Sequence, residues 1–233
     1  MKIIILAAGM GTRLNHNKPK CLTKLHTGET ILDRQLNSLL DFVDKKDITI
    51  VVGYKSELIK KQYENYSFVV NPYYKDTNTA KSLLYALDKN NADSGIIWLN
   101  GDVVFDSTIL KPLFGINQSS MLVNKSVVGD EEVKYNLNDD GSIKQVSKVI
   151  KNGLGEAVGI NKILNMHIDK FISNLKKCSD GDYFENAIEL LINENVKIYP
   201  IDILKSFCYE IDTQYDLNFV NKYLKENENK SKN

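Results

Sequence analysis

The first half of the chain alternates between short apolar runs and longer stretches in which apolar residues recur at helical spacing. The apolar runs predict four strands, at Lys2–Ala8, Ile48–Val52, Ser67–Val70 and Ile96–Leu99. The helical spacing lies between them, over Ile31–Val43 and Ala80–Leu87. Alternation of strand and helix is typical of right-handed crossovers, which build a mainly parallel sheet with helices on both faces. The pattern therefore predicts an α/β fold.

The second half begins with a different signal. Two strand-like segments, Val133–Leu137 and Ile143–Val149, flank the turn-forming Asn138–Gly141 and predict a small β-hairpin subregion. A further strand is expected at Ala157–Leu164, and helical patterns follow it near His167–Lys177 and Tyr183–Asn193.

No linker rich in Gly, Ser or Pro separates the two halves, so we expect a single domain over residues 1–226. Lys225–Asn233 is almost entirely polar and charged. We expect residues 227–233 to form a polar C-terminal tail that frays.

Composition limits the possible partners. Of the 233 residues 42% are hydrophobic and 26% are charged, as in an ordinary globular protein. Thirty basic residues balance thirty acidic ones, and a neutral chain argues against nucleic acid or an anionic membrane as the main partner. Three scattered cysteines fit free thiols, and the apolar run after Met1 is too short to span a membrane. We expect a cytoplasmic protein, either a monomer or a homodimer.

The first candidate for chemistry is the loop Gly9-Met10-Gly11-Thr12-Arg13, directly after the first predicted strand. Glycines there let backbone N–H groups approach phosphate oxygens closely. A dinucleotide-binding fingerprint would need a small residue where Leu14 stands, and the lysine of a P-loop is absent. The remaining alternatives are a phosphate-binding loop that also uses an arginine, and a tight strand-to-helix turn.

The charge around this loop favours phosphate binding. Residues 1–28 contain five basic residues and no acidic one, namely Lys2, Arg13, Lys18, Lys20 and Lys24. This positive segment follows the carboxyl end of a strand, which is where open α/β sheets bind their ligands. Pro19 restricts the backbone just before Lys20. A solvated basic surface is the alternative, above all for Lys2 and Lys24.

Leu6–Leu14 followed by Lys18–Leu22 resembles the opening of the sugar-phosphate and small-phosphate nucleotidyltransferases. The resemblance implies a Rossmann-like, GT-A-like fold in which Arg13 and Lys20 are catalytic and contact the triphosphate. It also implies nucleotide binding by the loop residues Leu6, Ala8, Gly9, Gly11 and Thr12.

Later segments follow the order of that family. Val51–Lys55 resembles the strand end that precedes the family's second helix, and Thr77–Leu83 resembles the segment that lines its nucleobase and ribose pocket. The resemblance implies nucleotide binding by Tyr54, Asn78, Thr79 and Ser82. Leu99–Asp102 and Tyr209–Leu217 resemble its two metal motifs, which implies nucleotide binding at Gly101 and Mg²⁺ binding by Asp102 and Asp212. Helix capping is the alternative role for both aspartates.

The same resemblance implies an acceptor pocket at Lys148, Glu156 and Gly159, although an exposed strand lysine and a loop glutamate fit the residues equally well. Tyr183, with Tyr73, Tyr74 and Phe184, is a candidate for an aromatic cage that would hold a quaternary ammonium, and packing in the core is the alternative.

The chain length and Tyr209–Asp212 look most like the phosphocholine cytidylyltransferases. The expected partners are CTP and a small phosphorylated metabolite, whose phosphate would attack the α-phosphorus without a protein nucleophile. The alternatives are a sugar-1-phosphate nucleotidyltransferase that uses UTP, dTTP or GTP, a GT-A glycosyltransferase and a non-catalytic nucleotide sensor. A glycosyltransferase usually carries Asp-x-Asp, which Asp102-Val103-Val104 lacks.

Overall fold

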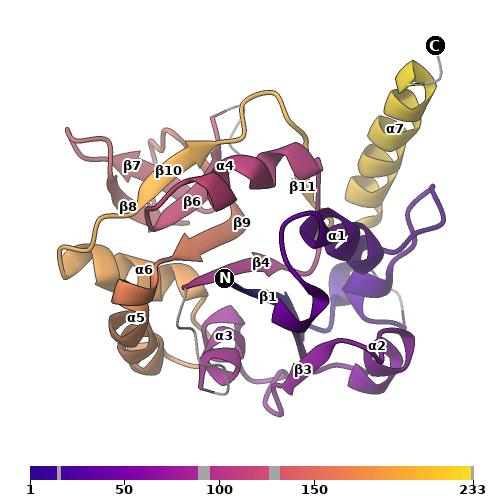
Figure 1. The fold of residues 1–233 in the computed structure, drawn as a ribbon, viewed down its shortest axis with the longest axis horizontal. Helices are drawn as coiled ribbons and strands as arrows, with labels where there is room; N and C mark the ends of the chain where they lie inside the picture. Colours follow the sequence, from indigo (N-terminus) through magenta and orange to yellow (C-terminus); the bar gives the residue numbers. More distant parts are fainter. Residues whose placement is uncertain (15–16, 89–94, 126–131, 232–233) are drawn as a thin grey trace.

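The computed structural model describes residues 1–14, 17–88, 95–125 and 132–231. Its centre is a mainly parallel sheet with the strand order β10-β6-β9-β4-β1-β2-β3 (Figure 1). The parallel core consists of β1 (Lys2–Ala7), β2 (Ile48–Val52), β3 (Ser67–Val70) and β4 (Ile96–Asn100). On the other side of β4, β9 (Gly155–Ile163) runs antiparallel to both β4 and β6 (Ser120–Asn124), and β10 (Tyr199–Asp202) is parallel to β6.

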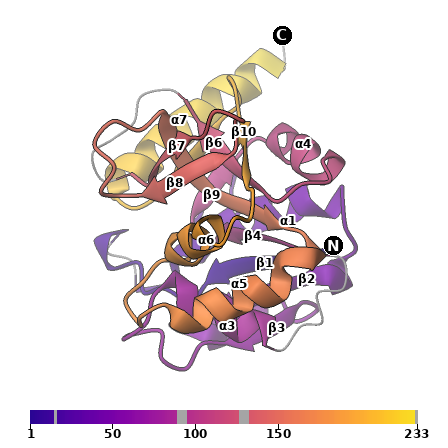
Figure 2. The same cartoon turned by 90° about the vertical axis from the view of Figure 1, so that its left-hand side faces the viewer.

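Helices cover both faces of the sheet because successive side chains of β1 point to opposite sides. Ile4 and Leu6 pack in a core with α3 (Thr79–Leu87), α5 (Asn165–Lys177) and α6 (Phe184–Asn193), which lie side by side (Figure 2). Ile3 and Ile5 pack on the other face, in a core to which α1 (Ile31–Leu40), α2 (Ser56–Gln62) and α4 (Leu110–Gly115) contribute. The predicted α/β fold with two covered faces is confirmed.

The predicted hairpin is also present, as β7 (Lys134–Leu137) and β8 (Ile143–Ser147). Its turn contains Gly141 at a positive φ of 80°. The backbone N–H of Val146 donates to the carboxylate of Glu189 on α6, at 3.1 Å, which ties the hairpin to the helical layer. Four short 3₁₀ helices complete the connections, at Thr12–Leu14, Lys20–Leu22, Lys45–Asp47 and Ser107–Ile109.

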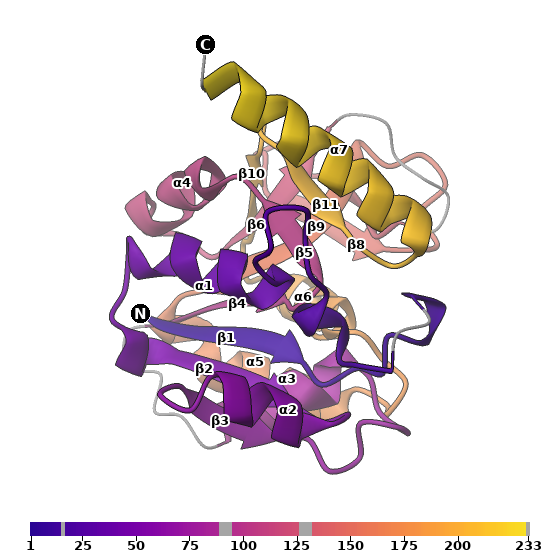
Figure 3. The same cartoon turned by 90° about the vertical axis from the view of Figure 1, so that its right-hand side faces the viewer.

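A second, two-stranded sheet lies next to the main one. It pairs β5 (Val103–Phe105) with β11 (Cys208–Glu210) in antiparallel fashion, and α7 (Gln214–Ser231) follows β11 (Figure 3). Val104 on β5 packs with Leu217 and Val220 of α7 in a third hydrophobic cluster. The β5–β11 pair holds the C-terminal part of the chain against β5, the strand that follows β4 in the sequence.

Helix α7 extends into the segment that was expected to form a polar C-terminal tail. The chain is helical as far as Ser231, so the polar segment from Lys225 continues α7 beyond its last core residue, Leu224, and extends away from the sheet (Figure 1). A run of Lys, Glu and Asn contains no helix-breaking residue, which explains why the helix continues. Among the described residues no helix is long and apolar enough to cross a membrane.

Candidate active site

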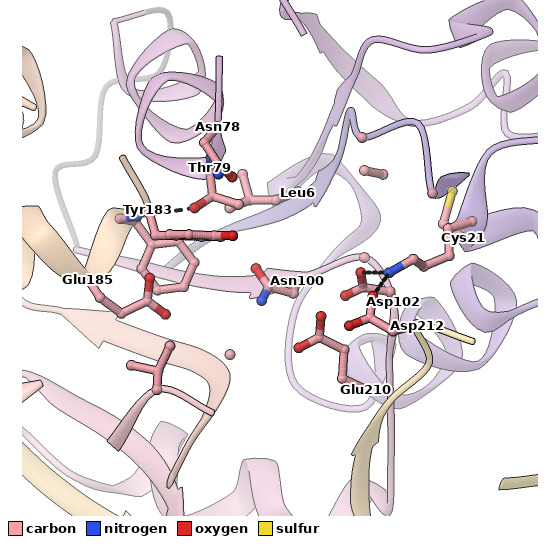
Figure 4. Close-up of a pocket in the computed structure, with 18 of the residues that line it drawn as sticks. Leu6, Cys21, Asn78, Thr79, Asn100, Asp102, Tyr183, Glu185, Glu210 and Asp212 are labelled. Atoms are coloured by element: carbon pink, nitrogen blue, oxygen red, sulfur yellow. Dashed lines mark hydrogen bonds and ion pairs between the residues drawn. The ribbon is translucent and has the colours of Figure 1, made fainter. Parts of the chain in front are cut away.

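One cavity of about 330 Å³ opens at the carboxyl ends of β1 and β4 (Figure 4). It is the place at which open α/β sheets bind ligands. The predicted site residues that line it are Leu6, Gly9, Gly11, Thr12, Arg13, Lys20, Asn78, Thr79, Gly101, Asp102, Lys148, Gly159, Tyr183 and Asp212. The fold thus brings together residues that are spread over almost the whole sequence.

The glycine loop packs directly against Lys20. Gly11 has a φ of 58°, and a Cβ at this position would lie 3.0 Å from the Cβ of Lys20. A larger residue at position 11 would therefore be strained and would displace the lysine. At the end of β4, Gly101 donates its N–H to the carbonyl of Leu6, at 2.9 Å, and a Cβ there would lie 2.8 Å from the same oxygen. Glycine at position 101 lets the two strand ends converge.

Lys20 points into a group of carboxylates. Its Nζ is 2.7 Å from Asp102 Oδ2 and 2.5 Å from Asp212 Oδ1, and Arg13 forms a second ion pair with Asp212, at 2.8 Å. Burial alone would lower the pKa of Lys20, but the two carboxylates outweigh it and raise the pKa above its ordinary value. Lys20 is therefore a permanent positive charge. The Arg13 side chain is 63% exposed, which leaves its guanidinium accessible to a ligand.

The β5–β11 ribbon positions the acidic residues. Val103 is paired with Glu210, and the N–H of Ile211 donates to the carbonyl of Asp102, at 3.0 Å. As a result Asp102, Glu210 and Asp212 each offer a carboxylate oxygen, and these oxygens lie within 4.8 Å of one another. The neighbouring Asp102 carboxylate and, after it, partial burial raise the pKa of Glu210 to about 9.

Glu210 was missed in the sequence analysis. It lies two residues before Asp212 in Tyr209–Leu217, so the motif itself contained the signal. Alternation along a strand does place residues two apart on one face, but a three-residue strand followed by a turn gives no clear period.

The capping roles considered for the two aspartates are not observed. Asp102 is followed by strand β5 and not by a helix. At the start of α7 Thr213 is the capping residue, because its Oγ1 accepts from the N–H of Asp216 and the Asp216 carboxylate accepts from the N–H of Thr213, at 3.3 and 2.7 Å. The Asp212 carboxylate therefore does not cap α7 and lines the cavity, where it pairs with Lys20 and Arg13.

The acidic cluster has the chemistry of a magnesium site. Three carboxylates from Asp102, Glu210 and Asp212 supply hard oxygen donors of the kind that Mg²⁺ prefers. Asp102 Oδ1 is buried and has no hydrogen-bond partner among the described residues. A buried oxygen without a partner is costly, and a metal ion would satisfy it.

The wall next to β1 is built from the start of α3. Asn78 caps this helix, and its Oδ1 accepts from the N–H of Thr79, at 2.8 Å. The Oγ1 of Thr79 accepts from the N–H of Phe184, at 3.1 Å, which joins α3 to the start of α6. These two residues hold the cavity wall in place beside Leu6 (Figure 4).

Three residues predicted to bind the nucleotide do not line the cavity. The carbonyl of Ala8 accepts from the N–H of Tyr54, at 3.0 Å, so these two residues connect the loops after β1 and β2. Ser82 is buried, and its hydroxyl accepts from the side chain of Asn71, at 3.0 Å. All three residues lie outside the lining of the cavity, and their contact with nucleotide stays a prediction.

Glu156, predicted to bind the acceptor, lies beside the cavity without lining it. It accepts from the Asn124 side chain on β6, at 3.1 Å. Burial, and after it the charge of Glu132, raises the pKa of Glu156 to about 7. Glu132 itself lines the cavity.

The remaining acceptor residues also line the cavity, together with two residues that the sequence analysis did not single out. Lys148 lies over the ring of Tyr183, with its Nζ 4.8 Å from the ring centroid. Glu185 at the start of α6 and Asn100 at the end of β4 also line the cavity (Figure 4). Their positions depend on the packing of distant elements, and a polar residue at one end of a helix or strand carries no sequence signal of this role.

The chain is similar to several known proteins. Residues 3–123 match the MobA-like NTP transferase domain. The chain is 28% identical over 245 residues to the choline-phosphate cytidylyltransferase of Streptococcus pneumoniae, covering 98% of this chain and 100% of that protein. It is 29% identical over 241 residues to the bifunctional protein GlmU of Methanococcus vannielii, covering 97% of this chain and 56% of the relative. The chain thus spans about half the length of the GlmU relatives it matches.

Solved structures show the same fold. The CTP:phosphocholine cytidylyltransferase of Streptococcus pneumoniae superimposes with a TM-score of 0.83 at 23% identity, covering 96% of this chain and 98% of that one. The inositol-1-phosphate CTP transferase of T. maritima gives a TM-score of 0.78 at 19% identity, covering 92% of this chain and 90% of that one.

The class that this fold and these relatives define is the nucleotidyltransferases, as the sequence analysis predicted. Within that class, the chain belongs to the family of MobA-like NTP transferase domains.

Proposed function

We propose that the protein transfers CMP from CTP to the phosphate group of a small phosphorylated metabolite, with Mg²⁺ as cofactor and pyrophosphate as the second product. The observation that carries this proposal is the meeting of the glycine loop, Lys20 and the cluster Asp102, Glu210 and Asp212 in one cavity. The arrangement combines positive groups for phosphates with hard oxygen ligands for a divalent ion.

The triphosphate would lie along the glycine loop. The loop from Gly9 to Thr12 lines the cavity, and its backbone N–H groups are suited to bind phosphate oxygens. Arg13 is exposed enough to reach these oxygens, and Lys20 supplies a charge that does not titrate near neutral pH. Both cations would stabilise the negative charge that develops at the α-phosphorus and on the leaving pyrophosphate.

Asp102, Glu210 and Asp212 would hold the metal ion. When bound, Mg²⁺ would neutralise phosphate charge and help to orient the reacting groups. Lys20 bridges Asp102 and Asp212, so the same carboxylates also fix the lysine in the cavity. Positioning and charge stabilisation are the contributions that this chain makes to the reaction.

The acceptor supplies the nucleophile. A phosphate monoester has a second pKa of about 6 and is largely dianionic at neutral pH, so it needs no general base. Lys148, which lines the cavity together with Gly159 on β9, would attract this dianion. The reaction forms one bond from an acceptor oxygen to the α-phosphorus and breaks the bond to pyrophosphate.

The choice of CTP is supported by the names of the relatives that match over almost the full chain, since both solved neighbours described above and one relative are CTP-dependent by name. The GlmU match favours a second candidate, a sugar-1-phosphate nucleotidyltransferase.

A pyrophosphate-release screen tests the proposal. Each of CTP, UTP, GTP and ATP is offered with Mg²⁺ to a panel of choline phosphate, ethanolamine phosphate, glycerol phosphate, inositol phosphate and sugar 1-phosphates. We expect release with CTP and at least one acceptor, and none without acceptor. Turnover with UTP and a sugar 1-phosphate would replace the first candidate by the second, and release with no combination would reject both.

A further inference from the structure

The cavity contains a buried carboxylate that the proposed mechanism does not use. Glu185 is only 7% exposed, lies in the first turn of α6 and lines the cavity. Its Oε2 has no hydrogen-bond partner among the described residues. A buried carboxylate oxygen without a donor is a large cost to the folded protein. Residues that carry such a cost often face a ligand that satisfies them.

A second acceptor atom faces the same part of the cavity. Asn100 Oδ1 is buried and also has no hydrogen-bond partner among the described residues. Figure 4 shows the polar ends of Glu185 and Asn100 facing one another across the open space, with Tyr183 beside them. A ligand group that carries N–H or O–H bonds and lies between these two acceptor oxygens would donate hydrogen bonds to both.

The neighbouring cation does not satisfy Glu185. Lys148 attracts the carboxylate electrostatically, but its Nζ lies over the Tyr183 ring. A ligand whose phosphate is attracted by Lys148 would therefore bring its adjoining groups close to Glu185. Glu185 would then lie on the acceptor side of the cavity.

The aromatic groups needed to hold a quaternary ammonium are not gathered here. Tyr183 and Phe184 are the aromatic residues among those that line the cavity, in the part of the chain that the structure describes. Phe184 is 1% exposed and packs edge-on against Trp98, while Lys148 covers the Tyr183 ring. Recognition of a trimethylated nitrogen normally uses several open aromatic faces.

We infer that Glu185, helped by Asn100, is a specificity residue that binds an N–H or O–H group of the acceptor. This inference rests on the proposed function and narrows it to acceptors that carry a primary amine or a hydroxyl group near the phosphate. A site built to bind a hydrogen-bond donor rejects an analogue that lacks the donor, because its own polar atoms are then left unsatisfied.

Two matched pairs of acceptors test the inference. Phosphoethanolamine and phosphocholine differ in the N–H groups, and glycerol 3-phosphate and propyl phosphate differ in the hydroxyls. With CTP and Mg²⁺, we expect kcat/KM to favour the donor-bearing member of at least one pair by about 100-fold or more. The pair that shows the preference identifies the donor as amine or hydroxyl.

Glu185→Gln supplies the second half of the test, with Glu189→Gln on the same helix as the matched control, since Glu189 lies outside the cavity. We expect Glu185→Gln to reduce an amine preference about 10-fold or more, and a hydroxyl preference less, because the Gln carbonyl still accepts a hydrogen bond. Glu189→Gln should change neither preference.

Equal use of both members in each pair, or an unchanged preference in Glu185→Gln, would overturn the inference and leave the proposed function intact. A change in the choice of nucleoside triphosphate, with no change in the choice of acceptor, would assign Glu185 to the nucleobase instead. Release of pyrophosphate with none of the four acceptors, while the sugar phosphates of the wider panel also fail, would reject both.

Discussion

Replacement of Lys20 by methionine removes the charge at the centre of the site while keeping most of the side-chain length. The Lys20 side chain is 13% exposed and bridges Asp102 and Asp212, so its loss leaves the carboxylates of the acidic cluster without their nearest cation. Loss of one partner from a fully buried ion pair costs about 3–5 kcal/mol. Because Asp102 and Asp212 are 21% and 24% exposed, we expect a smaller loss of unfolding free energy, about 2 kcal/mol.

The effect on turnover should be separable from this effect on stability. A lost charge contact in the transition state is worth about 2.7–4 kcal/mol, which corresponds to a 100- to 1,000-fold fall in kcat. The assay is steady-state pyrophosphate release at saturating CTP and acceptor, beside urea denaturation of the same protein. Lys24→Met is the matched control, because Lys24 is exposed in the same basic segment. A kcat within a few-fold of wild type in a folded Lys20→Met protein would refute the role given to Lys20.

Three further predictions follow from the same site. Asp102→Asn and Asp212→Asn should each abolish metal-dependent activity, and the double variant should be hardly slower than either single variant, because the effects of residues that act as a unit are non-additive. If the loss of activity in the double variant equals the product of the two single losses in the pyrophosphate assay, the two aspartates do not share an ion. With Mg²⁺ present, CTP should raise the thermal midpoint more than UTP, GTP or ATP at equal concentration, since saturation at about 100 Kd adds about 2.7 kcal/mol; a larger shift with another nucleotide would overturn the choice of CTP. Burial raises the pKa of Glu185 from 4.5 to about 7, although its own backbone N–H and Lys148 oppose the rise, so the ionised carboxylate destabilises the fold. This destabilisation is absent below about pH 4.5 and complete above pH 7. Glu185→Gln should therefore raise the unfolding free energy of the unliganded protein by up to about 3 kcal/mol at pH 8 and by much less at pH 5. Denaturation curves that show equal effects of the substitution at both pH values would show that Glu185 does not titrate in this way.

The sheet was predictable because its central strands are buried on both faces. The segment Ile96–Leu99 of β4, for example, is an uninterrupted apolar run, and β1–β4 were found within a residue or two of their observed ends. The hairpin was predictable for a different reason, since Asn138–Gly141 supplies the turn between its strands. Both signals are local, so one sequence is enough to reveal them.

The parts that were not foreseen depend on long-range pairing. The two short strands of the β5–β11 ribbon are three residues each and lie about half the chain apart, too short for a clear period. Their pairing brings Glu210 beside Asp102, and no local sequence pattern predicts that contact. Glu185 is similar, since a glutamate in the first turn of a helix is ordinary in a sequence. Only the packing of α6 against the sheet shows that its carboxylate is buried.

Transfer of an isotopic label tests directly whether the protein moves CMP from CTP to the acceptor phosphate. CTP labelled at the α-phosphorus and CTP labelled at the γ-phosphorus are incubated separately with enzyme, Mg²⁺ and the acceptor found in the screen. We expect the α-label to appear in a CDP-linked product and the γ-label only in pyrophosphate, with both signals lost in Lys20→Met. Transfer of the γ-label to the acceptor, or release of CMP without a linked product, would contradict it.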